Sequence, residues 1–149
     1  MKIEIVALGD YVQVRGGFAF KSEHFSDVGI PVVRISDIQD DLVSVERAAR
    51  ISIELIGRGE KYQVEPGDIL IAMSGATTGK IGIVPDNCIQ PILQNQRVGN
   101  FKIKDLKKVD KTYLKQYVGS SVYQSEIFKS IELLGNKTSS GTGFALTVI

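Results

Sequence analysis

Two apolar runs flank a small polar loop near the middle of the chain, a pattern that predicts a hairpin of two buried strands. The runs Ile69 to Met73 and Ile81 to Val84 are short and continuously apolar, and Pro66-Gly67 and Pro85-Asp86 supply turns at their outer ends. The loop between them, Ser74-Gly-Ala-Thr-Thr-Gly-Lys80, offers two glycines, three hydroxyl groups and one ammonium group. Such a loop can bring backbone amides and a cation against a phosphate.

Alternation of apolar and polar positions predicts two further strands. Tyr11 to Arg15 alternates as a half-buried strand. Gly29 to Ile38 alternates as well and places Arg34 and Ser36 on one face, so we expect Arg34 to be held on a rigid strand beside a small hydroxyl group. Phe18-Ala-Phe20, between these strands, is expected to anchor a loop to the core, although exposed rings could stack on bases.

Helical patterns lie in the middle and near the end of the chain. Val45 to Arg50 and Ser52 to Ile56 suit short helical turns. Asp110 precedes a predicted helix at Tyr113 to Val118, which Gly119 ends. Ser121 to Gln124 forms a capping box for a second helix that ends at Gly135, with four apolar residues on one face. These four are Ile127, Phe128, Ile131 and Leu134.

These elements predict an α+β fold, a single domain over residues 1–149. We expect a curved, mostly antiparallel sheet or partial barrel with short helices packed on it, two C-terminal helices, and an irregular tail at 136–149. A content of 43% hydrophobic and 23% charged residues is typical of a globular protein, and no apolar run approaches the ~20 residues of a membrane span. We therefore expect a cytoplasmic protein. The single Cys88 and the single His24 give no zinc-ligand spacing, so no metal or other cofactor is expected.

The central loop resembles a nucleotide-binding P-loop but fails its requirements. Only three residues separate Gly75 from Gly79, and Ile81 occupies the position of the metal-binding hydroxyl. The segment after Lys80 also leaves no room for a helix to begin. A small nucleotide-dependent enzyme is therefore a weak hypothesis, and a plain hairpin loop with glycines in turn conformations is the simpler alternative.

A polar cluster and an uneven charge distribution point to a polyanion. Gln94, Asn95, Gln96 and Arg97 carry side chains that can pair with base edges, although they could equally cap turns and satisfy buried backbone groups. Residues 1–96 carry nine Lys and Arg against thirteen Asp and Glu, a balance of −4, and residues 97–149 carry nine against four, a balance of +5. The second part could face a polyanion, but Lys-rich stretches are usually solvated surface.

Several motifs taken in order resemble a target-recognition domain of the specificity subunit of type I restriction-modification enzymes. The resemblance runs from about residue 6 to residue 140 and rests on order and spacing rather than on any single motif. The motifs are Leu8-Gly-Asp, Gly29-Ile-Pro-Val-Val-Arg-Ile-Ser-Asp-Ile38, Gly67-Asp-Ile-Leu-Ile-Ala-Met-Ser-Gly75, Thr78-Gly-Lys-Ile-Gly82, Asn95-Gln-Arg97, Tyr113-Leu and Gly135.

The resemblance implies a DNA-reading module without catalysis of its own. In that family two such domains, joined by long helices, each read half of a split double-stranded DNA target, while a modification (methyltransferase) subunit and a restriction subunit do the chemistry. The family continues from a glycine like Gly135 into a spacer helix, whereas this chain stops at Ile149. The expectation is thus a lone recognition domain whose assembly with those subunits is in doubt.

Phosphate contacts give affinity and base contacts give specificity, so the polar residues divide into two groups. Ser74, Thr77, Thr78 and Lys80 suit phosphates and Arg34 and Gln94 to Arg97 suit bases, although the reverse assignment stays open; Lys21 and Ser36 complete the candidate set. An ion pair from Arg34 to Asp37 or Asp68 is the structural alternative for that arginine. A remnant that acts only as a protein-interaction domain is the alternative function.

Overall fold

The computed structural model describes residues 4–135, and the side chains of residues 4–129. The expected tail at 136–149 therefore lies outside the described residues. The chain divides into two compact units, Arg15–Phe101 and Met1–Val14 with Lys102–Ile149. The strands and short helices are followed by two C-terminal helices, which confirms the α+β class.

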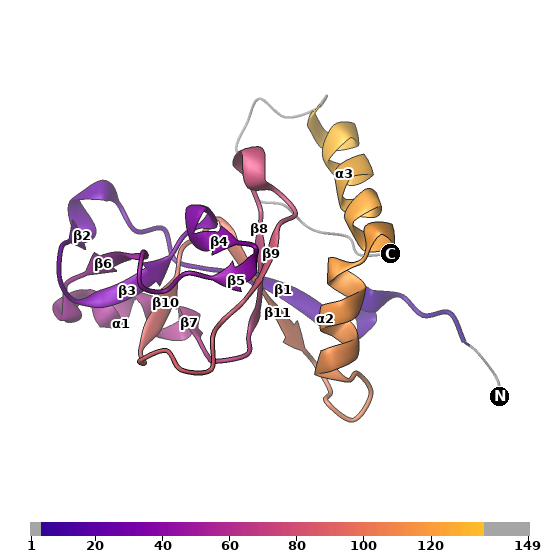
Figure 1. Cartoon of the computed structure of the whole chain (residues 1–149), viewed down its shortest axis with the longest axis horizontal. Helices are drawn as coiled ribbons and strands as arrows, with labels where there is room; N and C mark the ends of the chain where they lie inside the picture. The colour runs from indigo at the N-terminus through magenta and orange to yellow at the C-terminus, as the bar shows by residue number, and fades with distance from the viewer. Residues whose placement is uncertain (1–3, 136–149) are drawn as a thin grey trace. The chain divides into compact units, whose positions relative to one another are not determined.

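The strands form two sheets rather than one continuous sheet. A six-stranded sheet has the order β1 (Val12–Gly16), β11 (Val98–Ile103), β8 (Ile69–Ala72), β9 (Ile81–Ile83), β5 (Asp41–Val43) and β4 (Ile38–Gln39). A five-stranded sheet has the order β2 (Phe25–Ser26), β6 (Ala49–Ile51), β3 (Ile30–Val33), β10 (Ile92–Gln94) and β7 (Gln63–Val64) (Figure 1). Most recorded pairings are antiparallel, which agrees with the sequence prediction.

Two strand pairings position the polar loops of the chain. β8 and β9 pair antiparallel with Ile71 opposite Ile81, which confirms the predicted central hairpin. β3 and β10 pair in parallel with Leu93 opposite Val32, so the carboxyl ends of these two strands lie at the same edge of the five-stranded sheet.

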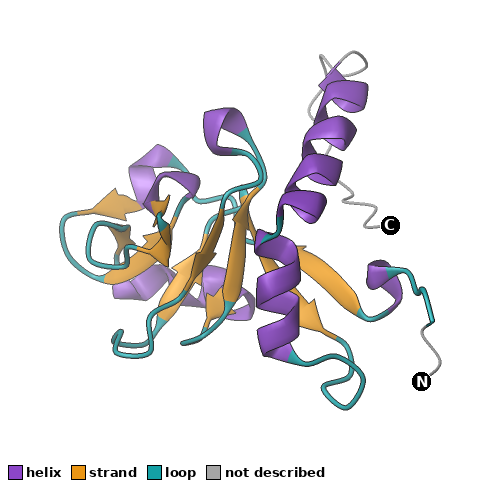
Figure 2. Cartoon of the chain, turned by 45° about the vertical axis from the view of Figure 1, so that its right-hand side comes forward, coloured by secondary structure: helices purple, strands orange, loops and turns teal. Residues whose placement is uncertain are grey.

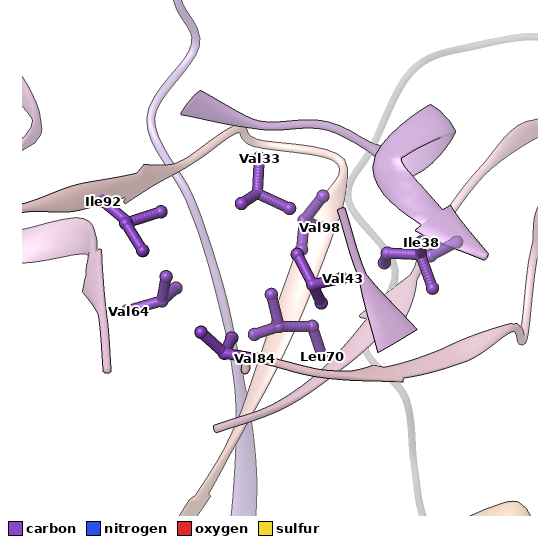
Figure 3. Close-up of a cluster of buried hydrophobic side chains, with 9 residues drawn as sticks. Val33, Ile38, Val43, Val64, Leu70, Val84, Ile92 and Val98 are labelled. Atoms are coloured by element: carbon purple, nitrogen blue, oxygen red, sulfur yellow. The ribbon is translucent and has the colours of Figure 1, made fainter. Parts of the chain in front are cut away.

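A cluster of buried aliphatic side chains joins strands of both sheets. Its nine members come from β3, β4, β5, β7, β8, β10, β11 and the segment after β9, and eight of them are labelled in Figure 3. β3 and β8 are buried along their whole length, so side chains on both faces of each strand are covered. This explains why the sequence of β8 is continuously apolar rather than alternating.

A second cluster holds the aromatic residues near the N-terminus. Phe20 is buried with Ile51 and Leu93, and Phe18 packs against the same cluster with its ring centroid 4.9 Å from that of Phe20. The expected anchoring role of these two rings is confirmed.

Short helices connect the strands. The 3-10 helices are η1 (Leu8–Asp10), η2 (Ser22–His24), η3 (Ile35–Asp37), η4 (Ile53–Leu55), η5 (Glu60–Tyr62) and η6 (Gly75–Thr77), and α1 is a single turn at Ile56–Gly59. The helical turn expected at Ser52 to Ile56 is therefore confirmed by η4. The turn expected at Val45 to Arg50 is wrong in its second half, because Ala49–Ile51 forms β6 and pairs with both β2 and β3.

The strand expected at Gly29 to Ile38 is interrupted. β3 ends at Val33, and η3 separates it from β4. The backbone N–H of Arg34 donates to Asp37 Oδ2 at 2.8 Å, which closes a tight turn where alternation predicted extended chain. Arg34 therefore stands at the end of a strand and not on its face.

Two α-helices follow β11: α2 (Lys111–Gly119) and α3 (Ser121–Gly135) (Figure 2). Asp110 caps α2 by accepting the N–H of Tyr113 at 2.8 Å. The cap of α3 is Ser120 and not Ser121, because Ser120 Oγ accepts the N–H of Tyr123 at 3.3 Å. Of the predicted apolar face, Ile127 is buried but Phe128 is 55% exposed, and the side chains of Ile131 and Leu134 lie outside the described set.

Neither a membrane-spanning helix nor a group of metal ligands is found in the described part of the chain. No helix among residues 4–135 is both long enough and apolar enough to cross a bilayer. No three His, Cys, Asp or Glu side chains within residues 4–129 are grouped as metal ligands would be.

Candidate functional site

Three loops that follow the carboxyl ends of β3, β8 and β10 meet in the Arg15–Phe101 unit. The N–H of Asn95 donates to the carbonyl oxygen of Val33 at 2.9 Å, and the N–H of Met73 donates to the carbonyl oxygen of Arg97 at 2.9 Å. A Cβ on Gly75 would lie 3.5 Å from Ile35 Cδ1. Residues 34–37, 74–80 and 95–97 are thereby neighbours, and we call them the three-loop site.

The loop from Ser74 to Lys80 is built by its glycines. Gly75 and Gly79 have φ of +75° and +89°, a conformation that L side chains rarely adopt. Thr78 Oγ1 donates to the carbonyl oxygen of Gly75 at 2.6 Å, whereas Ser74 Oγ and Thr77 Oγ1 are buried atoms that lack a recorded partner among the described residues. The loop returns to β9 rather than to a helix, so it lacks the helix N-terminus on which a P-loop depends.

Lys80 ends this loop with an exposed side chain. Its backbone is fixed, since its N–H donates to the carbonyl oxygen of Thr77 at 3.0 Å and its own carbonyl oxygen accepts from Ala72 at 2.9 Å. No ion pair of Lys80 is recorded within residues 4–129. The ammonium group is thus available to an external anion.

Arg34 is held in place but remains accessible. Its Nε lies 3.7 Å from Asp37 Oδ2, which is an ion pair but too long for a hydrogen bond, and its side chain is 43% exposed. The guanidinium carbon lies 5.9 Å from the centre of the Phe25 ring. The Asp37 pairing foreseen as a structural alternative is therefore present, whereas Asp68 instead accepts a hydrogen bond from Asn100 at 2.7 Å. Ser36 is exposed, with its Oγ 3.5 Å from Asp37 Oδ1.

The polar cluster from Gln94 to Arg97 divides into buried and exposed members. Gln94 is fully buried, and its Nε2 donates to the carbonyl oxygens of Arg15 and Val98 at 2.7 and 2.5 Å. Its side chain therefore satisfies backbone groups, which is the structural alternative for this residue, and it cannot reach a ligand. Asn95 is half-buried, and its Oδ1 lies 3.4 Å from the N–H of Arg97.

Gln96 and Arg97 are the exposed members of this turn. The N–H of Gln96 donates to the carbonyl oxygen of Phe18 at 3.0 Å, so the turn is fixed by its backbone while both side chains extend outward. Arg97 is the one basic residue of the positively charged second part of the sequence that belongs to the Arg15–Phe101 unit. The Lys-rich stretch from Lys102 to Lys115 belongs to the other unit, so the sequence charge balance does not map onto the three-loop site.

A second group of cations lies at η2 and α1. The N–H of Lys21 donates to His24 Nδ1 at 3.1 Å, and His24 Nε2 lies 3.3 Å from Arg58 Nη1. Phe25, the neighbour of His24, is the ring beneath Arg34. Only Lys21 of this group was expected from the sequence, because nothing in the sequence pattern links His24 to Arg58.

A family model described as the type I restriction modification DNA specificity domain matches residues 2–144. The chain is 27% identical over 129 residues to the type I restriction enzyme MjaVIII specificity subunit of Methanocaldococcus jannaschii, covering 85% of this chain and 30% of that protein. It is 29% identical over 104 residues to the EcoBI specificity subunit of Escherichia coli, covering 68% of this chain and 19% of that protein. The chain thus spans less than a third of the length of these relatives.

Solved structures agree on the fold. A chain from a study of complex assembly and conformational transition of the type I R-M system superposes with a TM-score of 0.61 at 17% identity, over 97% of this chain and 32% of that one. The HsdS subunit from Thermoanaerobacter tengcongensis superposes with a TM-score of 0.56 at 13% identity, over 91% of this chain and 40% of that one. Because the family model spans nearly the whole sequence and the fold agrees, the chain belongs to the family of type I restriction-modification DNA specificity domains.

Proposed function

We propose that this chain recognises one half of a split double-stranded DNA target, as the reading part of a type I restriction-modification specificity subunit. It binds the DNA through the three-loop site and performs no chemistry itself. The observation that carries the proposal is the convergence of three polar loops, each of which leaves a buried strand and presents an exposed cation. Arg34, Lys80 and Arg97 supply these cations.

Lys80 suits the phosphate backbone, and Ser74 and Thr77 are secondary candidates beside it. Lys80 is a flexible point charge without a recorded ion pair in the described residues. The Oγ atoms of Ser74 and Thr77 lack partners there but are buried, so they reach a phosphate only if the loop rearranges. Phosphate oxygens accept hydrogen bonds from hydroxyl, ammonium and backbone N–H groups alike. This part of the site therefore contributes affinity that does not depend on the base sequence.

Arg34, Gln96 and Arg97 suit base edges. A guanidinium group pairs with guanine and a glutamine amide pairs with adenine, and both need a fixed orientation. Arg34 obtains it from Asp37 and Phe25, whereas for Gln96 and Arg97 the hydrogen-bonded turn fixes the backbone from which their side chains extend. Asn95 and Ser36 are secondary candidates, and we omit Gln94 because it is fully buried.

Selection from a random pool of duplex DNA tests the proposal. The full chain is immobilised, bound fragments are sequenced over several rounds, and the enriched sequence is then used in binding titrations against a scrambled duplex. We expect one short motif, of half the length of a split target, with weak affinity for the single domain. Absence of any enriched motif, together with equal affinity for all duplexes, would contradict sequence recognition.

Assembly with other protein is a second candidate function, and it is favoured by an apolar hollow in the other unit. The hollow has a volume of about 650 Å³ and is lined by the N-terminal segment, by residues 108–110 and by α2. Ile5 and Tyr113 in its wall are 98% and 67% exposed. Apolar surface of this kind is typical of protein interfaces. We assign it to the remainder of the specificity subunit, and light scattering of the chain mixed with a fragment that carries this remainder would test assembly.

A further inference from the structure

The ring of His24 lies between two groups that can only donate hydrogen bonds. The backbone N–H of Lys21 lies 3.1 Å from Nδ1, and Nη1 of Arg58 lies 3.3 Å from Nε2. The Phe20 ring meets the imidazole edge-on with centroids 6.3 Å apart, so the ring is contacted on a third side. The imidazole is therefore held in one orientation by its surroundings.

The Lys21 N–H, the His24 ring and the Arg58 guanidinium together have more hydrogen-bond donors than acceptors. A neutral imidazole has one N–H and one lone pair, whereas a backbone amide N–H and a guanidinium have only protons to offer. The shorter contact, at Nδ1, assigns the lone pair to the Lys21 N–H, and we therefore infer that the proton of His24 is at Nε2 and faces Arg58. Two donors thus stand 3.3 Å apart with no acceptor between them.

We propose that His24 Nε2 and the Arg58 guanidinium together bind one phosphate oxygen of the DNA backbone. A single anionic oxygen placed beside both nitrogens accepts from both and removes the repulsion between them. Lys21 places a third cation nearby, and no ion pair of Lys21 or Arg58 is recorded among residues 4–129. The inference rests on the proposed DNA-reading function and adds to it a backbone contact outside the three-loop site.

The position of this phosphate contact relative to Arg34 supports the assignment. His24 is followed directly by Phe25, whose ring lies 5.9 Å from the Arg34 guanidinium carbon. Two consecutive residues, His24 and Phe25, thus contact Arg58 and Arg34 respectively. Contacts to phosphates beside a base-reading arginine fix the register of a protein on the duplex without reading sequence themselves.

Binding titrations of variants of the full chain test the inference. We expect Arg58→Ala to weaken binding of preferred and scrambled duplexes alike, by about two- to fivefold as for an exposed charge pair, and to make the salt slope shallower by about one unit. His24→Asn keeps an acceptor for the Lys21 N–H but lacks a group at the Nε2 position, so it should weaken binding while the melting temperature is retained. The double variant should lose little more than either single variant, because both groups bind the same oxygen.

Arg47→Ala is the matched control, since Arg47 is exposed and no polar contact of its side chain is recorded in the described residues. It should bind DNA as the wild type does. His24 is the single histidine of the chain, so its nitrogen NMR signals need no assignment. In the free protein they should report a proton on Nε2, and DNA should shift the Nε2 signal most.

The outcomes separate this inference from the proposed function. If the wild type enriches no DNA sequence, the proposed function fails. If the wild type binds its motif while Arg58→Ala and His24→Asn retain full affinity and salt slope, only the shared phosphate contact is refuted. Equal losses in Arg58→Ala and Arg47→Ala would also refute it, because a general charge effect would then account for both.

Discussion

Replacing Arg34 with alanine should separate its contribution to stability from its contribution to base recognition. The Arg34 to Asp37 ion pair is 3.7 Å long and the arginine is 43% exposed, so solvent screening limits it to about 0.2–1 kcal/mol. The contact over the Phe25 ring at 5.9 Å adds about 0.5–1 kcal/mol. The free energy of unfolding should therefore fall by roughly 1–2 kcal/mol, which lowers the melting temperature by roughly 2–8 °C in a chain of this size.

The effect of Arg34→Ala on DNA binding should be larger on the preferred sequence than elsewhere. A paired contact of arginine with guanine contributes about 1–3 kcal/mol of discrimination, which is roughly 5- to 150-fold in affinity. Fluorescence anisotropy with the preferred and a scrambled duplex, run at a temperature well below either melting point, measures this ratio. We expect it to collapse toward one for the variant.

Asp37→Asn is the matched control for this experiment. An asparagine oxygen can still accept the N–H of Arg34, whereas the ion pair is lost. Its melting temperature should fall by less than that of the arginine variant, because the contact over the Phe25 ring remains. Discrimination between the two duplexes should fall only in part, because Phe25 still orients the guanidinium group. If Arg34→Ala melts lower but discriminates as well as the wild type, Arg34 stabilises the loop and reads no base.

Three further predictions concern the loops and the helices. Lys80→Ala should weaken binding to all duplexes alike and reduce the salt slope by about one unit, whereas Lys115→Ala on α2 should leave titrations unchanged. Gly17→Ala should lower the free energy of unfolding by several kcal/mol in denaturant titrations, because the added Cβ would overlap a backbone carbonyl of β10. Gly57→Ala is the control: its Cβ would meet no atom within 4 Å, so the free energy of unfolding should change by less than about 1 kcal/mol. Burial, with the Tyr117 hydroxyl adding to it, raises the pKa of Tyr123 to about 12. The folded state then holds this proton more tightly than the unfolded state, so stability is lost between about pH 10 and pH 12; Tyr123→Phe should lose less over that range in melting curves.

The sequence predicted elements well where one physical signal dominated. The hairpin of β8 and β9 is correct because a strand buried on both faces must be apolar throughout. The prediction for the segment after β3 was wrong because alternation says nothing of the Asp37 carboxylate, which closes a turn on Arg34. Ser120 and Ser121 are both capable caps, and the choice between them depends on where α2 ends, which periodicity locates only to within a residue or two.

The candidate site was predictable in its residue types but not in its geometry. Side-chain chemistry marked the residues of all three loops, although the loops lie far apart in the sequence. Their convergence depends on the parallel pairing of β3 with β10, which no local pattern encodes. For Gln94 the sequence left two roles open, because an amide that can pair with adenine can equally donate to backbone carbonyls. In the structure the side chain is buried and donates to two carbonyl oxygens.

In the three-loop site, exchangeable side chains lie on loops, and the strands that carry these loops are held by the core. β3, β8 and β10 are buried along their lengths, so the strands that carry the loops are fixed by the core. The exposed side chains of Gln96 and Arg97 make few contacts with that core, and their exchange should alter the bases read at little cost in stability. Exchange of Arg34 also removes its contacts with Asp37 and Phe25. Gly75 and Gly79 are different, since their positive φ values shape the loop itself. If specificity resides in these side chains, exchanging the first group alters the preferred sequence at constant affinity for scrambled DNA, whereas replacing either glycine lowers affinity for every sequence.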